Sequence, residues 1–302
     1  MPATKEGTAK LSIFAVSLLI AMKVAASIIT GSIAITADAT HSVIDLFGVI
    51  IGYIGIRISA KPPDERHPFG HGKAENVAGA IIAGLIAIAA VTIAYQAVSR
   101  LISGAAVELV TIGIYVTAAA IVINGIISWY ALRVARATDS MALEATARDM
   151  FTDMLSSGAV LVGLILVRLT GITILDPIVA LLVAILIART AYLTMKKSFG
   201  GLMDTKLPQA EEDEIISCLG KHSDQIAGFH QIRTRKAGSQ RYIDFHLVVS
   251  KHISVDQAHK LCDKIEREIE SRLSDTSVTI HVEPCDGKCE LCSTSPDLCQ
   301  RT

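Results

Sequence analysis

The sequence predicts a helical membrane protein: six transmembrane helices followed by a small α+β domain with the order α-β-β-α-β. Two observations carry this fold class. Of the 302 residues, 51% are hydrophobic, and the mean hydropathy of +0.48 is high for a soluble protein. Charged residues are also unevenly placed, because residues 11–195 hold few of them and residues 205–290 hold many. An apolar part followed by a charged part indicates a membrane domain and then a soluble domain.

Six apolar runs are long enough to cross a bilayer, which takes about 20 residues per helix. They cover residues 11–30, 34–59, 77–101, 109–134, 142–169 and 173–195. Gly31, Gly104 and Gly171 mark the turns after the first, third and fifth runs. The first run contains Lys23 and is followed at once by a second run, so we interpret it as a span and not as a cleavable signal peptide.

Basic residues in the loops predict the orientation of these spans. They gather before span 1, between spans 2 and 3, and after spans 4 and 6, at Lys5, Lys10, Lys61, Arg66, Lys73, Arg133, Arg136, Lys196 and Lys197. The opposite loops hold little beyond Arg100 and Arg168. Because Lys and Arg favour cytoplasmic loops, we expect both termini in the cytoplasm and the spans in the lipid bilayer of the cytoplasmic (inner) membrane.

After Leu207 the pattern changes to that of a soluble domain. Helical periodicity predicts helices over 210–219 and 254–273, and alternation predicts strands over 226–234, 242–249 and 278–282. Turn residues at 237–239 join the first two strands as a hairpin. We therefore divide the chain into a transmembrane domain (1–205), a cytoplasmic domain (206–285) and a Cys-rich tail (286–302).

Two pairs of ionisable residues interrupt the apolar runs. His41 and Asp45 lie four residues apart in the second span, and Asp149 and Asp153 lie four residues apart in the fifth. Four residues make about one helical turn, so each pair projects from one face of its helix. Ionisable groups inside a membrane are costly and usually pair or mark an ion path. One imidazole and three carboxylates form a ligand set that zinc, manganese and iron(II) accept.

These four groups also bind protons, so a metal ion and protons would compete for one site. Such competition is the physical basis of antiport. The alternative is that the four residues only pair between helices. Asp38 lies one turn before His41, where it is either a group at the entrance of the site or an ordinary interfacial acid.

The polar loop between spans 2 and 3 holds a second candidate group. Asp64, His67 and His71 can converge on one ion, and Pro68 with the neighbouring glycines shapes the turn. The alternative is an ordinary polar loop.

The soluble domain holds a third candidate group. Six of the nine histidines lie there, at His222, His230, His246, His252, His259 and His281. His246 and His281 occupy strand positions, and Glu283 is near the second. A single buried histidine is usually satisfied by a hydrogen bond, but several on strands favour metal binding.

The cysteines are Cys218, Cys262, Cys285, Cys289, Cys292 and Cys299. Their clustering near the end fits a reducing compartment better than a disulfide framework. The last four can bind Zn or Cu(I) through thiolates, although their spacing is irregular. The alternative is a tail with incidental thiols, unstructured after Pro284 unless a metal orders it.

Several stretches resemble the cation diffusion facilitator family, from about residue 11 to 285. They are residues 37–45 (ADATHSVID), 67–75 (HPFGHGKAE), 228–235 (GFHQIRTR), 257–259 (QAH) and 280–284 (IHVEP). The resemblance implies a six-helix membrane domain, a metallochaperone-like cytoplasmic domain and a homodimer. It places a transport site at His41, Asp45, Asp149 and Asp153, and a loop site at Asp64, His67 and His71. It places a cytoplasmic metal site at His230, His246, His259, His281 and Glu283, and an inter-domain salt bridge between Lys73 and Asp204.

The sequence departs from the zinc exporters of this family in two places. They commonly carry His where this chain has Asp149, and an Asp-x-x-x-Asp pair resembles the manganese branch. Three carboxylates with one imidazole make a harder site, which suits Mn²⁺ or Fe²⁺. His41 and the soluble domain look like the zinc and iron branch, but Glu283 replaces an expected Asp. The Cys-rich tail matches no feature of the family.

Together these patterns predict a proton-coupled antiporter that exports a divalent cation, Zn²⁺, Mn²⁺ or Fe²⁺, from the cytoplasm. A passive cation channel and a membrane-tethered metal sensor without net flux are the alternatives. No nucleophile with a paired base and no phosphate-binding loop is present in the sequence, so we do not expect an enzyme. The net charge of −1 predicts no nucleic-acid partner.

Overall fold

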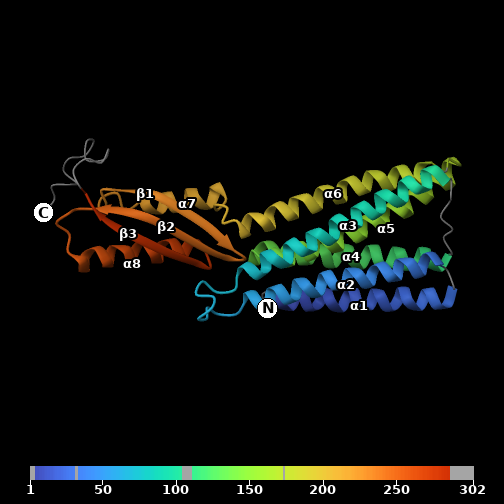
Figure 1. Cartoon of the computed structure of the whole chain (residues 1–302), viewed down its shortest axis with the longest axis horizontal. Coiled ribbons are helices and arrows are strands. Elements are labelled where there is room, and N and C mark those ends of the chain that lie inside the picture. The colour runs from blue at the N-terminus through green and yellow to red at the C-terminus, as the bar shows by residue number, and fades with distance from the viewer. Residues whose placement is uncertain (1–3, 31–32, 104–110, 173, 286–302) are drawn as a thin grey trace. The chain divides into compact units, whose positions relative to one another are not determined.

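The computed structural model describes residues 4–30, 33–103, 111–172 and 174–285 (Figure 1). Within these ranges, only the backbone is described for residues 27, 30, 33–41, 43–44, 111–114, 116, 160, 163–164, 167–168 and 176. The chain divides into two compact units, Met1–Gly200 and Gly201–Thr302. We call them the helical unit and the sheet unit. The domain boundaries expected at 205 and 285 stay predictions.

The helical unit is built of long helices that lie side by side (Figure 1). They are α1 (Lys5–Thr30), α2 (Ile33–Ser59), α3 (Lys73–Ser103), α4 (Thr111–Thr138), α5 (Met141–Thr170) and α6 (Leu175–Leu202). Each predicted span falls on one of these helices, and the predicted helical fold is confirmed. Most of the helices run several residues past the predicted ends, because polar residues at a helix end can stay helical outside the apolar layer.

Four helices are long and apolar enough to cross a membrane when only the described residues are considered. These segments are Lys5–Ala26 of α1, all of α3, Thr117–Thr138 of α4 and Pro177–Leu202 of α6. The two helices with the acidic pairs, α2 and α5, are not among them. In α5 the first half carries Glu144, Arg148, Asp149 and Asp153, which lower its hydropathy. That α2 and α5 also cross the membrane stays a prediction.

Four of the helices enclose the centre of the helical unit. Contacts join α1 to α2, α2 to α5, α5 to α4 and α4 back to α1, and α3 packs against α2 and α5. Glycines in α2 allow this close packing. A Cβ atom at Gly52 would lie 2.2 Å from Oγ1 of Thr146, and one at Gly55 would lie 2.5 Å from Cβ of Ala78. Larger residues at these positions would push α2 away from α5 and α3.

A buried carboxylate ties together one end of these helices. Glu75, at the start of α3, is fully buried. It accepts hydrogen bonds from Lys5 Nζ at 2.8 Å, Ser59 Oγ at 3.0 Å and Ser140 Oγ at 2.5 Å. A buried charge is tolerated only when it is paired and hydrogen-bonded, and Glu75 meets both conditions. It therefore fixes the ends of α1, α2 and α3 and the connection before α5.

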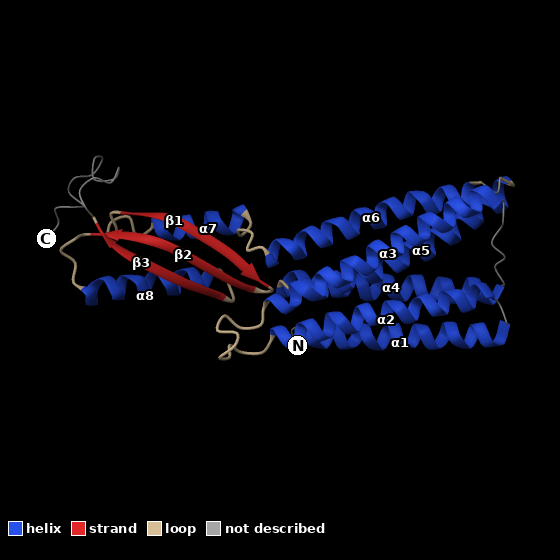
Figure 2. Cartoon of the chain, in the orientation of Figure 1, coloured by secondary structure: helices blue, strands red, loops and turns tan. Residues whose placement is uncertain are grey.

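The sheet unit has the predicted order α-β-β-α-β (Figure 2). It contains α7 (Gln209–Gly220), β1 (Gly228–Ala237), β2 (Gln240–Val249), α8 (Val255–Arg272) and β3 (Thr276–Pro284). The strand order is β1-β2-β3, with β1 antiparallel and β3 parallel to β2. Gly238 takes a φ of 62° in the β1–β2 turn, a value that glycine adopts without strain.

One face of the sheet packs against the two helices. Along β2 the core residues are Ile243, Phe245, Leu247 and Val249, which alternate with residues of the opposite face. Helix α8 begins with a capping box, in which Ser254 and Gln257 exchange side-chain-to-backbone hydrogen bonds. Its apolar stripe of Leu261, Cys262, Ile265 and Ile269 joins the same core.

A β-bulge interrupts the pairing of β1 with β2. It lies between His230 and Arg233, and Gln231 within it has a φ of 51°. A bulge adds one residue and shifts the alternation of side chains. Phe229 and Ile232 therefore both pack on the core, although three positions separate them.

Candidate metal centres

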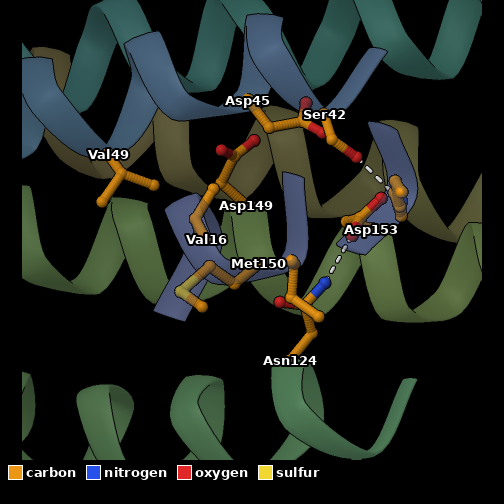
Figure 3. A pocket seen from close by; sticks show the side chains of 10 residues that line it. Val16, Ser42, Asp45, Val49, Asn124, Asp149, Met150 and Asp153 are labelled. Atoms are coloured by element: carbon orange, nitrogen blue, oxygen red, sulfur yellow. Dashed lines mark hydrogen bonds between the residues drawn. The ribbon is translucent and has the colours of Figure 1, made fainter. Parts of the chain in front are cut away.

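A small cavity inside the helical unit gathers three of the predicted ligands (Figure 3). Its volume is about 20 Å³, which is room for about one water molecule or ion. Asp45 from α2 and both Asp149 and Asp153 from α5 line it. Around them lie Val16, Leu19, Lys23, Ser42, Val49, Asn124 and Met150. The structure thus brings the carboxylates of two helices to one small cavity.

The local sequences explain how the carboxylates meet. Asp149 and Asp153 lie one turn apart on α5 and share a face, as the four-residue spacing predicts. Gly48 lies on α2 beside them, and a Cβ atom there would come within 3.0 Å of Oδ2 of Asp149. The missing side chain at Gly48 leaves the space that the Asp149 carboxylate occupies.

The imidazole predicted for this site cannot be placed. The backbone of His41 lies in α2, one turn before Asp45, but its side chain is outside the described residues, and so is that of Asp38. The structure therefore brings together the three carboxylates, and the complete four-ligand site stays a prediction.

Three polar side chains that line the cavity, those of Lys23, Ser42 and Asn124, were not predicted as site residues. Lys23 of α1 is 1% exposed, and its Nζ donates a hydrogen bond to Oγ of Ser42 at 2.8 Å. Asn124 of α4 is 4% exposed, and its amide nitrogen donates to Oδ2 of Asp153. Lys23 and Asn124 each interrupt an apolar run, which is the one signal that the sequence offers for them.

The charges in this cavity indicate what it can bind. Three carboxylates in one low-dielectric space repel one another unless a cation or protons lie among them. Lys23 supplies one positive charge, and a divalent ion would supply two more. Oxygen donors around a space for one ion are suited to a divalent metal ion.

The loop between α2 and α3 brings together the second predicted group. Nδ1 of His67 lies 3.1 Å from Oδ1 of Asp64, and Nε2 of His71 lies 3.4 Å from Oδ2 of Asp64. One ligand atom from each residue lies within 4.8 Å of the others, a spacing that one metal ion can bridge. The backbone N–H of His67 donates to Asp64 at 2.7 Å and holds the pKa of that carboxyl below its usual range. Asp64 is thus ready to bind a cation.

The sheet unit forms a row of histidines across its three strands. His230 pairs with His246 in the antiparallel register, and His246 pairs with His281 in the parallel one. Glu283 lies two residues beyond His281 and so on the same face of the sheet. Its carboxylate oxygens lie 2.8 Å from Nδ1 of His246, 3.3 Å from Nε2 of His230 and 3.7 Å from Nε2 of His281. His230, His246 and Glu283 place their ligand atoms within 4.8 Å of one another.

The other histidines of the sheet unit lie apart from this row. His222 is buried, and its Nε2 lies 2.9 Å from Glu268, whereas its Nδ1 has no hydrogen-bond partner among the described residues. His259, a predicted ligand, lies on α8 with its Nδ1 3.7 Å from Asp263, and it is not part of the group of His230, His246 and Glu283. Its role as a ligand stays a prediction.

The sequence also singled out an inter-domain salt bridge and six cysteines. Asp204 lies 3.4 Å from Arg235 within the sheet unit, and the salt bridge between Lys73 and Asp204 stays a prediction. Cys285 is buried beside Ala227 and Val248. The other tail cysteines, Cys289, Cys292 and Cys299, lie outside the described residues. Cys218 and Cys262 are buried as free thiols, and burial raises the pKa of Cys218 to about 11.

Comparison with known families matches both units. The model described as cation efflux transmembrane domain matches residues 9–203, and the model described as cation efflux protein, cytoplasmic domain, matches residues 207–285.

Curated relatives cover most of the chain. An uncharacterized transporter of Synechocystis sp. is 36% identical over 278 residues, which are 92% of this chain and 90% of that protein. The cation-efflux pump FieF of Escherichia fergusonii is 32% identical over 89% of each chain. Among solved structures, the zinc form of CzrB is 35% identical, with a TM-score of 0.27, and covers 29% of this chain and 98% of its own.

Proposed function

The chain belongs to the cation efflux family, and from this premise we propose that it exports a divalent transition-metal ion in exchange for protons. As a family member it is a membrane-spanning cation efflux transporter with a cytoplasmic domain. The metal, the counter-ion and the residues of the transport site belong to the proposal.

One observation carries it: Asp45, Asp149 and Asp153 line one small cavity inside the helical unit. Burying three carboxylates inside a bundle of apolar helices is unfavourable, and packing of the helices does not require them. Such groups usually mark an ion path. With His41 they form the proposed transport site. Their donors fit Mn²⁺ and Fe²⁺ as well as Zn²⁺.

Proton coupling follows from the chemistry of these ligands. Each must lose its proton to bind a metal ion, so metal binding on the cytoplasmic side releases protons and proton binding on the far side releases metal. Lysines and arginines gather in the loops on one side of the predicted spans, which supports an orientation with both termini in the cytoplasm. The membrane is then the inner membrane of the cell.

The polar clusters outside the bundle have proposed roles of their own. Asp64, His67 and His71 form a loop site through which metal ions enter. His230, His246 and Glu283, with His281 beside them and His259 as a further proposed ligand, form a regulatory site in the cytoplasmic domain. We also propose a homodimer, because the resemblance of this chain implies one.

Transport in sealed vesicles tests the proposal. The full chain is reconstituted with a pH gradient, and uptake of Mn²⁺, Zn²⁺ and Fe²⁺ is followed with a trapped fluorescent indicator. We expect uptake that depends on the gradient. Asp153→Ala is expected to reduce it to the level of protein-free vesicles, because the site loses a charged ligand. Thr152→Ala is the matched control, since the Thr152 hydroxyl only donates to the Arg148 carbonyl of its own helix at 2.9 Å.

The two alternatives give other results. A passive channel would carry metal after the pH gradient has been dissipated. A metal sensor would bind metal without any flux in the wild type. Normal flux in Asp153→Ala would show that the transport site lies elsewhere.

A further inference from the structure

Asn124 has an unusual place in the carboxylate cavity. It comes from α4, which carries none of the predicted ligands, and 4% of its surface is exposed. Its amide nitrogen donates a hydrogen bond to Oδ2 of Asp153 (Figure 3). Its amide oxygen, Oδ1, is buried and has no hydrogen-bond partner among the described residues.

The hydrogen bond fixes the orientation of the amide. A carboxylate accepts hydrogen bonds, so it must face the NH₂ group, because the amide oxygen would repel it. The oxygen is thereby directed away from that bond, on a residue that lines the cavity. A buried acceptor without a donor destabilises a protein, and such an atom in a binding site indicates a ligand that satisfies it.

We propose that the amide oxygen of Asn124 is a further metal ligand of the transport site and favours hard divalent ions such as Mn²⁺ over Zn²⁺. The inference rests on the proposed function, since it needs metal ions to pass through this cavity. An amide carbonyl is a hard, neutral donor of the type that Mn²⁺, Mg²⁺ and Ca²⁺ accept. A tetrahedral zinc ion is already satisfied by three carboxylates and His41. A fifth donor adds affinity for ions that take five or six ligands.

Two variants separate the proposed ligand role of Asn124 from a role in positioning Asp153. The NH₂ group can act alone by holding Asp153 in place, and the oxygen then has no part in binding. Asn124→Leu removes both the oxygen and the NH₂ group at similar volume. Asn124→Asp keeps an oxygen at the same position but replaces the donor to Asp153 with a second carboxylate oxygen, which repels Asp153 unless a cation or a proton lies between them.

The experiment compares Mn²⁺ and Zn²⁺ transport by the full chain in vesicles with a pH gradient. The readout is the ratio of kcat/KM for Mn²⁺ to that for Zn²⁺. We expect Asn124→Leu to lower this ratio about tenfold. This is the lower end of the roughly 10- to 100-fold loss in metal affinity or activity that follows when a group supporting a metal site is removed. We expect Asn124→Asp to keep the ratio at or above that of the wild type. Ser128→Ala is the control, because Ser128 also joins α4 to α5, through the Ala147 carbonyl at 2.7 Å, but does not line the cavity.

Each result has one meaning. An unchanged ratio in Asn124→Leu, or equal losses for both ions in the two variants, would overturn the ligand role. A wild type that carries Zn²⁺ but not Mn²⁺ would overturn it as well. A wild type that carries no ion contradicts the proposed function itself and is thereby distinguished from a failure of this inference alone. If Asn124→Leu does not fold, the ratio in Asn124→Asp decides, since a loss there excludes the oxygen as the determinant.

Discussion

At the scale of single residues, the buried side chain of Lys23 affects how the cavity can bind a metal ion. It puts a positive charge where a cation is proposed to bind, and its side chain is buried with Nζ 2.8 Å from Ser42. A cation next to several carboxylates offsets their repulsion when no metal is present. The same charge competes with an incoming metal ion. We therefore expect Lys23 to lower the metal affinity of the proposed site and to favour release of the ion.

We predict that Lys23→Met binds metal more tightly than the wild type. Removing one positive charge near the site is expected to lower KM for the transported ion about tenfold, since one charge at this range contributes on the order of a kcal/mol or more. Release should slow, so kcat should fall. The measurement is vesicle uptake at varied metal concentration. Lys10→Met, an exposed residue of the same helix, is the control, and an unchanged or raised KM in Lys23→Met would contradict the prediction.

The residues of this cavity also show how far a sequence reveals a site. Asp149 and Asp153 are recognisable because two acids one turn apart in an apolar run form a pattern. Lys23 and Asn124 form no such pattern, since each is a single polar residue on its own helix. They reach the cavity only because α1 and α4 pack around α2 and α5, and this packing is not encoded in any local spacing.

At the scale of elements, the predicted order of helices and strands is confirmed, and β1 and β2 pair as the predicted hairpin, but the pairing of β3 was not predictable. Alternation identified the strands, because each has one face on the core. It did not indicate that β3 lies parallel to β2, which places His281 beside His246. The bulge at Gln231 was also missed, since a glutamine with positive φ has no local signature.

The contact between the end of α7 and α8 gives a prediction about pH. Glu268 of α8 is 2.9 Å from Nε2 of His222 and 3.3 Å from Nζ of Lys221. The hydrogen bond from His222, followed by that from Lys221, lowers the pKa of Glu268 to about 2. A lowered carboxyl pKa stabilises the folded state above the ordinary value near 4.5, and this stabilisation is lost as the pH falls towards 2.

We therefore expect the cytoplasmic domain to lose stability between about pH 4.5 and pH 2, with Glu268→Gln showing a shallower loss. Hydrogen exchange of α8 peptides in the full chain, measured across this range, tests the prediction. Glu270→Gln, an exposed acid of the same helix, is the control. Equal slopes for wild type and Glu268→Gln would show that this contact does not contribute.

At the scale of the whole molecule, each of the two units holds its own cluster of potential metal ligands. The cavity of Asp45, Asp149 and Asp153 lies among apolar helices, whereas the histidine row lies on a sheet face away from the core. A metal ion that binds the second site better in one conformation would shift the transporter towards that conformation. The two sites can then respond to the same ion with different results for transport.

Removing the histidine row alone separates the regulatory role from the transport role. His246 lies in the middle of the row, between His230 and His281, and 2.8 Å from Glu283. His246→Ala should therefore abolish metal binding in the cytoplasmic domain, which calorimetry of the full chain in detergent would show as the loss of one class of sites. Transport at saturating metal should persist, because the cavity ligands are intact, but half-maximal activity should need more metal. His252→Ala, an exposed histidine outside the row, should change neither quantity. Loss of all transport in His246→Ala, as expected for Asp153→Ala, would mean that the histidine row belongs to the transport path and is not a regulatory site.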